Sequence, residues 1–186
     1  MWVMASASRF ATRYWDYSLN AYAQVDVQTL CLRLQRDYQA NVNLLLLGGF
    51  AGTYGQVLAA EDWTRIKGAL IPFNQRYTQR IRRVREHAQQ FAGLHITARE
   101  CYRQLKALEL KAEQLEQQII AVSCDNGTRS RLLRHQDCAT DKQVLYNLLA
   151  YYAAWPIRST AAAEALRELA AALIRNSEIK GNHSQR

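Results

Sequence analysis

Basic side chains are concentrated between Trp63 and Arg85. This stretch contains no acidic residue and carries most of the net charge of +8. The guanidinium group of arginine presents a planar set of donors to phosphate or carboxylate oxygens. The stretch is therefore a candidate site for an anionic macromolecule, either RNA or an acidic protein surface. Its basic residues are Arg65, Lys67, Arg76, Arg80, Arg82, Arg83 and Arg85.

Five of these arginines lie on one predicted helix, over residues 73–91. Helical spacing places Arg76, Arg80 and Arg83 on one stripe and Arg82 and Arg85 beside it. All five are candidate anion-binding or nucleic-acid-binding residues. An alternative is a solvated helix face that is partly neutralised by acidic residues of the following helix, namely Glu109, Glu113 and Glu116. No zinc finger, RNP signature or KH loop accompanies the arginines, so sequence-specific nucleic-acid recognition is not predicted.

Three glycines, Gly48, Gly52 and Gly55, follow one face of a predicted helix. Glycine destabilises a helix by roughly 1 kcal/mol relative to alanine, so an interaction at this face should offset that cost. One interpretation is the close approach of another helix. The other is a groove for a ligand or a partner helix, in which case the three glycines are groove candidates.

The sequence contains no catalytic constellation. Its histidines lack a serine or cysteine partner at a motif spacing, and Gly48-Gly49 lacks the sequence context of a phosphate-binding loop. Cys124, His135 and Cys138 are too few and too unevenly spaced for a structural zinc site. We therefore predict no catalytic residue, no metal site and no cofactor. Asp16 is interpreted as a polar anchor that hydrogen-bonds near Asn41 or Asn43.

The elements that must position these residues are helices. The span from Tyr38 to Ala60 carries no charged side chain, which predicts a central buried helix with Asn43 as its N-cap. The low proline and glycine content favours helix throughout the chain. The predicted fold is all-α, with a single domain around this central helix.

A helical hairpin is predicted over residues 72–123. Its first helix ends near Gly93, and its second helix is predicted to begin with Thr97 as N-cap. Pro72 either starts the first helix or kinks a longer one, and the sequence leaves both alternatives open. Heptad-like spacing in the second helix predicts an antiparallel seam through Cys101, Leu105, Leu108, Ala112, Leu115, Ile119 and Val122.

The remaining boundaries follow from periodicity and turn chemistry. The N-terminal helical core spans about 9–71, a loop follows Asp125 as far as Thr140, and C-terminal helices over about 140–175 pack back on the core. Residues 176–186 are predicted to be a disordered tail. The uncharged span has too many polar residues for a membrane crossing, and no secretory signal is evident, so a cytoplasmic protein is expected.

A group of motifs in the N-terminal half comprises Tyr14-Trp15-Asp16-Tyr17-Ser18-Leu19, Tyr22, Val27, Cys31-Leu32-Arg33-Leu34-Gln35 and Val42-Asn43-Leu44-Leu45-Leu46. These motifs resemble the N-terminal signature of a small uncharacterised bacterial family, a domain of unknown function. The resemblance covers roughly the first ninety residues and also a later segment, 105–113. It implies a cytoplasmic helical protein and supplies no catalytic residues. Phe50 to Gly55 departs from the family pattern, which has a Trp and a charged pair there.

Three functional hypotheses follow. The first is a non-catalytic adaptor whose arginine face binds RNA or an acidic protein surface. The second is a protein interaction module in which the hairpin or the glycine groove binds a partner helix, and the arginines only confer solubility. The third is a small-molecule-binding protein or an enzyme of unknown chemistry. The oligomeric state is left open by the sequence.

Overall fold

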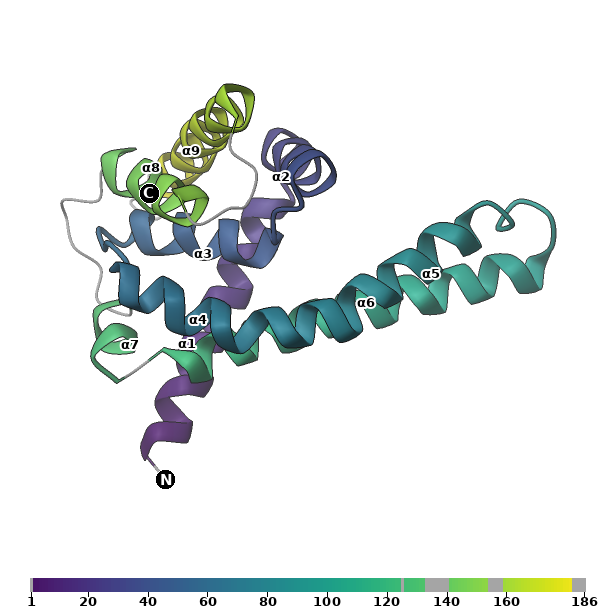
Figure 1. Cartoon of the computed structure of the whole chain (residues 1–186), viewed down its shortest axis with the longest axis horizontal. Coiled ribbons are helices and arrows are strands. Elements are labelled where there is room, and N and C mark those ends of the chain that lie inside the picture. Colours follow the sequence, from purple (N-terminus) through teal and green to yellow (C-terminus); the bar gives the residue numbers. More distant parts are fainter. Residues whose placement is uncertain (1, 125, 133–140, 154–158, 182–186) are drawn as a thin grey trace.

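A computed structural model describes residues 2–124, 126–132, 141–153 and 159–181 (Figure 1). The described part is all-α and forms a single domain, as predicted, and contains no strand. The elements in chain order are α1 (Trp2–Tyr22), α2 (Val25–Tyr38), α3 (Val42–Thr53), α4 (Ala60–Phe73), the π-helix η1 (Asn74–Thr78), α5 (Gln79–Gln89), α6 (Ile96–Ser123), α7 (Asn126–Leu132), α8 (Asp141–Ala153) and α9 (Thr160–Gly181).

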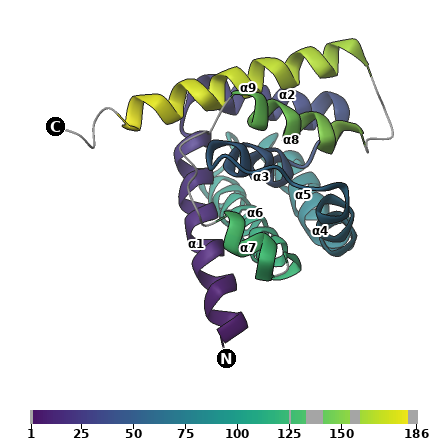
Figure 2. The same ribbon diagram turned by 90° about the vertical axis from the view of Figure 1, so that its left-hand side faces the viewer.

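Helix α3 is the predicted central helix. Every residue from Asn43 to Gly52 is buried, because α8 packs along α3 and the helices α1, α2, α6 and α9 also contact it (Figure 2). The predicted N-cap at Asn43 is wrong. Asn41 caps the helix instead, with its side-chain oxygen accepting from Leu44 N at 3.0 Å. Asn43 is thereby released for a different interaction, described below.

Pro72 lies inside a continuous helical stretch, so the alternative in which it starts a helix is wrong. Helix α4 runs past Pro72 directly into η1 and α5. Proline has no backbone N–H and clashes with the preceding turn, which disrupts the regular hydrogen-bond pattern. The chain responds with a π-helical turn, in which Gln79 N bonds to Asn74 O. This turn brings the side chain of Asn74 into the core.

The predicted antiparallel hairpin is present and projects from the body of the domain (Figure 1). Helix α6 packs against α4 near the body and against η1 and α5 further out. Its N-cap is His95, whose Nδ1 accepts from Thr97 N at 3.1 Å, rather than the predicted Thr97.

The predicted seam of α6 is only half right. Leu105, Ala112 and Ile119 are buried or half-buried, but the alternate seam residues Cys101, Leu108, Leu115 and Val122 are exposed. The inward positions include Glu109 and Glu116, which are buried. Because these acidic side chains have polar partners inside, α6 is rotated away from the seam that its apolar residues indicate.

The C-terminal region differs from the prediction in two places. The short helix α7 lies within the stretch predicted as a loop, and α9 extends to Gly181, into the predicted tail. The loop residues 133–140, which include His135 and Cys138, and the tail residues 182–186 lie outside the described residues. Among the helices in the described ranges, none combines the length and the hydrophobicity that a membrane crossing requires.

Candidate functional site

The groove predicted at the glycines is filled by the chain itself. A Cβ atom at Gly52 would lie 2.4 Å from Val144 Cα of α8, and one at Gly48 would lie 3.2 Å from Leu148 Cδ2. Gly55 lies beyond the end of α3 and has a φ of 71°. The glycines therefore permit the close approach of α8, as in the first interpretation, and leave no room for a ligand at this face.

The five candidate arginines divide into two groups, of which the first faces inward. Arg82 Nε donates to Glu109 Oε1 at 2.7 Å, and Arg82 Nη2 donates to Glu113 Oε1 at 2.8 Å. Arg85 Nε donates to Glu109 Oε2 at 2.5 Å. Arg82 and Arg85 are thus neutralised by α6, as in the solvated-face alternative, and hold the two arms of the hairpin together.

The second group consists of Arg76, Arg80 and Arg83, which are exposed on successive turns of η1 and α5. None of them forms an ion pair or a side-chain hydrogen bond with another described residue. The acidic residues described in the hairpin are engaged elsewhere, since Glu86 pairs with Arg85 and Glu100 with Arg103. We call these three residues the arginine stripe.

The two carboxyl groups that face the inward arginines have pKa values shifted in opposite directions. Burial acts to raise the pKa of Glu109, but the hydrogen bonds and charges of Arg85 and Arg82 outweigh it and lower that pKa. Burial raises the pKa of Glu113, and the nearby carboxyls of Glu109 and Glu116 add to the rise, against the opposing charge of Arg82. The lowered pKa of Glu109 keeps its carboxylate ionised at neutral pH, where it pairs with both arginines and stabilises the hairpin.

We expect Glu109→Gln to lower the free energy of unfolding by about 2–3 kcal/mol at pH 7, because two partly buried guanidinium groups lose a shared carboxylate. A lowered folded-state pKa contributes stability that is complete above the unfolded-state pKa and is lost as the pH falls through the folded-state pKa. The difference between wild type and Glu109→Gln should therefore shrink below about pH 4.5. Urea unfolding from pH 7 to pH 3 measures it, and a difference that stays constant over this range would contradict the role of the ion pair.

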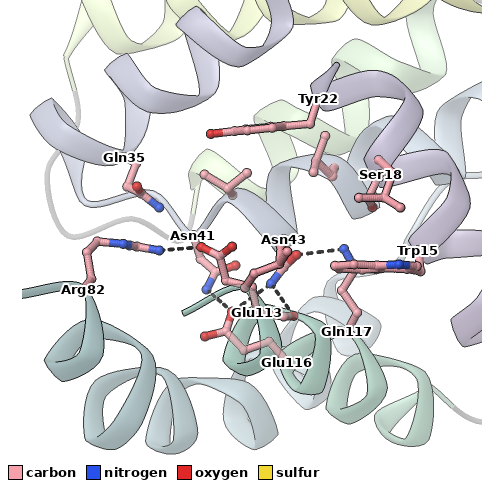
Figure 3. Close-up of a pocket in the computed structure, with 14 residues that line it drawn as sticks. Trp15, Ser18, Tyr22, Gln35, Asn41, Asn43, Arg82, Glu113, Glu116 and Gln117 are labelled. Carbon is pink, nitrogen blue, oxygen red and sulfur yellow. Dashed lines mark hydrogen bonds and ion pairs between the residues drawn. The ribbon is translucent and has the colours of Figure 1, made fainter. Parts of the chain in front are cut away.

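A buried polar cluster, centred on Glu116, joins the hairpin to the body (Figure 3). Glu116 is 1% exposed. Its Oε2 accepts from the side-chain amides of Asn41 and Asn43, each at 3.0 Å, and its Oε1 accepts from that of Asn74 at 2.8 Å. Gln117 Nε2 donates to Asn43 Oδ1 at 2.8 Å. The cluster thus ties α6 to the start of α3 and to the π-helical turn.

Helix α1 joins the same cluster through Tyr14. The Tyr14 hydroxyl donates to the backbone oxygen of Asn43, and burial, together with the nearby Glu116, raises the pKa of Tyr14 well above its ordinary value. The polar anchor predicted at Asp16 is wrong, because Asp16 is exposed. The sequence signal for the cluster was weak: Asn41 and Asn43 stand beside an apolar run, but Asn74 and Glu116 are distant in the sequence.

A pocket of about 100 Å³ lies between this cluster, α1 and α2 (Figure 3). Trp15, Tyr22 and Leu110 form part of its wall, and burial raises the pKa of Tyr22 to about 12. Arg82 and Glu113 also line it, but their charged groups are paired with each other. With this pairing and this volume, the pocket has room for a few water molecules or a very small ligand.

Comparison with known proteins identifies one family. A family model described as "Protein of unknown function (DUF2390)" matches residues 13–120. The matched segment runs from α1 to the last turn of α6, and so includes the arginine stripe, the Glu116 cluster and the pocket, whereas α8 and α9 lie beyond it. Comparisons with curated proteins and with solved structures give no match.

Proposed function

The chain belongs to the DUF2390 family of proteins of unknown function, and we propose that it is a non-catalytic binding protein whose arginine stripe engages an acidic surface on a partner protein. The observation that carries the proposal is the position of Arg76, Arg80 and Arg83. They lie exposed on a projecting arm, and none of them pairs with a described acidic residue.

An arm of this kind suits recognition of carboxylates. The body of the domain holds the base of the hairpin through the Glu116 cluster, and Glu109 holds α5 against α6. The stripe is therefore presented by a rigid element, which reduces the entropy lost on binding. Each guanidinium retains its donors for a bidentate contact with a carboxylate.

A protein partner is favoured over RNA by the surroundings of the stripe. Val84 and Tyr77 are exposed next to these arginines and are about half accessible. Apolar side chains bordered by arginine are typical of protein interfaces, whereas a backbone-binding RNA surface is dominated by positive charge. RNA binding is the outcome that would overturn this choice.

The test is photo-crosslinking in the protein's own host cell, with the crosslinking residue at Gln90, the exposed C-cap of α5 seven residues after Arg83. We expect adducts with protein segments rich in Asp and Glu. The double substitution Arg80→Glu plus Arg83→Glu should reduce their yield at least about tenfold, because it reverses the charge that attracts the partner.

The matched control is Arg99→Glu plus Lys106→Glu. It makes the same change in net charge on α6, where helical spacing places both residues on the other side of the hairpin, with Leu110. This control should leave the yield within about twofold if the stripe acts locally. Adducts that are mainly RNA, or a yield that is insensitive to the stripe substitution, would refute the proposal.

A further inference from the structure

Large apolar side chains are exposed at seven-residue intervals on both arms of the hairpin. Tyr77 in η1, Val84 in α5 and Phe91, two residues after the end of α5, are 49%, 54% and 46% exposed on the first arm. Leu108 and Leu115 are 49% and 42% exposed on α6. A seven-residue repeat is the spacing at which one helix packs along another.

The two rows lie on the same face of the hairpin. Arg85 contacts Glu109, so these two residues mark where the arms face each other. Val84 and Leu108 each precede a contact residue by one position. In two antiparallel helices packed side by side, residues that precede the contact line are turned to the same side. We call the surface formed by the two rows the apolar hairpin face.

This face points away from the pocket. Leu110, which follows the contact residue Glu109, lines the pocket on the opposite side of α6. Leu108 therefore lies on the side of α6 that is turned away from the residues of the body that line the pocket. Two rows of apolar side chains on adjacent antiparallel helices are the kind of surface against which a third helix packs in a bundle.

The charge beside the face selects its occupant. Arg80 lies one turn before Val84, and Arg83 lies directly before Val84, so the arginine stripe borders the face on the first arm. Lys111 lies one turn after Leu108 and is exposed on the other border. A second copy of this chain would bring these basic borders together, which disfavours self-association. An anionic helix would complement both borders.

We propose that the apolar hairpin face binds one amphipathic helix of a partner protein, with apolar residues at heptad spacing and Asp or Glu on both flanks. This inference rests on the proposed function and specifies the partner, because it adds an apolar seam to the acidic surface. The apolar row fixes the position of the helix, and the arginine stripe and Lys111 select its charge.

The test uses the full chain and three synthetic peptides. One has leucine at its heptad a and d positions and glutamate at e and g, one has lysine at e and g, and one has the acidic composition with its heptads scrambled. Fluorescence anisotropy measures binding, and circular dichroism measures the helix formed. We expect the acidic heptad peptide to bind at least about tenfold more tightly than either of the others.

Leu108→Asp and Leu110→Asp form a matched pair, because the two leucines are 49% and 50% exposed on opposite sides of the same helix. Leu108→Asp should weaken binding of the acidic heptad peptide at least about tenfold, and Leu110→Asp should weaken it less than about twofold. The double substitution Arg80→Glu plus Arg83→Glu should weaken binding of that peptide and strengthen binding of the lysine peptide, since it reverses the charge along one border of the face.

The two proposals fail in different ways. If both acidic peptides bind equally, Leu108→Asp has no effect and the stripe substitution abolishes binding, then the helix inference is wrong and the acidic-surface proposal stands. If the stripe substitution also has no effect, both are wrong. A dimer in light scattering that Leu108→Asp dissociates would overturn the inference as well, because a second copy would then occupy the face.

Discussion

Gly52→Ala is expected to lower the free energy of unfolding by about 3 kcal/mol, because the new methyl group collides with the backbone of another helix. A Cβ at Gly52 would lie 2.4 Å from Val144 Cα and 2.5 Å from Val144 N. No change of side-chain rotamer relieves a clash with main-chain atoms, so α8 must move away from α3. Urea unfolding followed by circular dichroism measures the loss.

Two other glycines provide a graded control. A Cβ at Gly48 would meet the end of the Leu148 side chain at 3.2 Å, so Gly48→Ala should cost only about 1 kcal/mol. Gly68 is exposed within α4, where a Cβ would meet no described atom beyond its own helix within 4 Å. Gly68→Ala should therefore stabilise the protein by about 0.5–1 kcal/mol through helix propensity. Equal effects at the three positions would show that α8 does not approach α3 this closely.

The central helix was predictable because its signal is local. An uncharged span is buried wherever the rest of the chain goes, and α3 is buried along its whole apolar run. Its N-cap was missed because Asn41 and Asn43 are both competent caps and only the tertiary partners of Asn43 decide between them. The existence of the helix thus follows from the sequence, and the position of its N-cap follows from the tertiary structure.

The two helices of the hairpin could be predicted from the sequence, but the faces that pack together could not. Leu108 and Leu115 fit the heptad pattern as well as Leu105 and Ala112 do, and periodicity cannot say which apolar rows face inward. The rotation of α6 is fixed by Glu109 and Glu116, whose partners come from other elements. A prediction based on hydrophobicity assigns charged residues to the surface, so it cannot identify a buried carboxyl group.

The same rotation explains the division of the candidate arginines. The sequence predicts Arg76, Arg80 and Arg83 on one stripe and Arg82 and Arg85 beside it; the first three are exposed, and the other two contact Glu109. Which group meets Glu109 depends on how α5 and α6 face each other, and this depends on contacts distant in the sequence. The sequence could thus locate the candidate site on a helix, but only the tertiary structure shows which of its arginines are not paired with a described acidic residue.

Glu116→Ala is expected to lower the free energy of unfolding by about 4 kcal/mol, because it leaves several buried amide donors without an acceptor. Asn41 and Asn43 donate to Glu116 Oε2, and Asn74 donates to Oε1. Gln118→Ala is the control, since Gln118 is exposed two residues further along α6 and should change stability by less than about 0.5 kcal/mol. Chemical unfolding of each variant measures the losses.

Glu116→Gln separates hydrogen bonding from packing. Glutamine has nearly the same shape as glutamate, so a packing role predicts almost no loss. Its amide nitrogen, however, would face either the two donors from Asn41 and Asn43 or the one from Asn74, and a donor cannot accept their hydrogen bonds. We therefore expect Glu116→Gln to lower the free energy of unfolding by about 2–3 kcal/mol.

A further change, Asn74→Ala, should lower the free energy of unfolding at least about 1 kcal/mol less in Glu116→Ala than in the wild type, because the partner of Asn74 is already absent. Additive losses would contradict the prediction, because they would mean that the cluster does not act as one network.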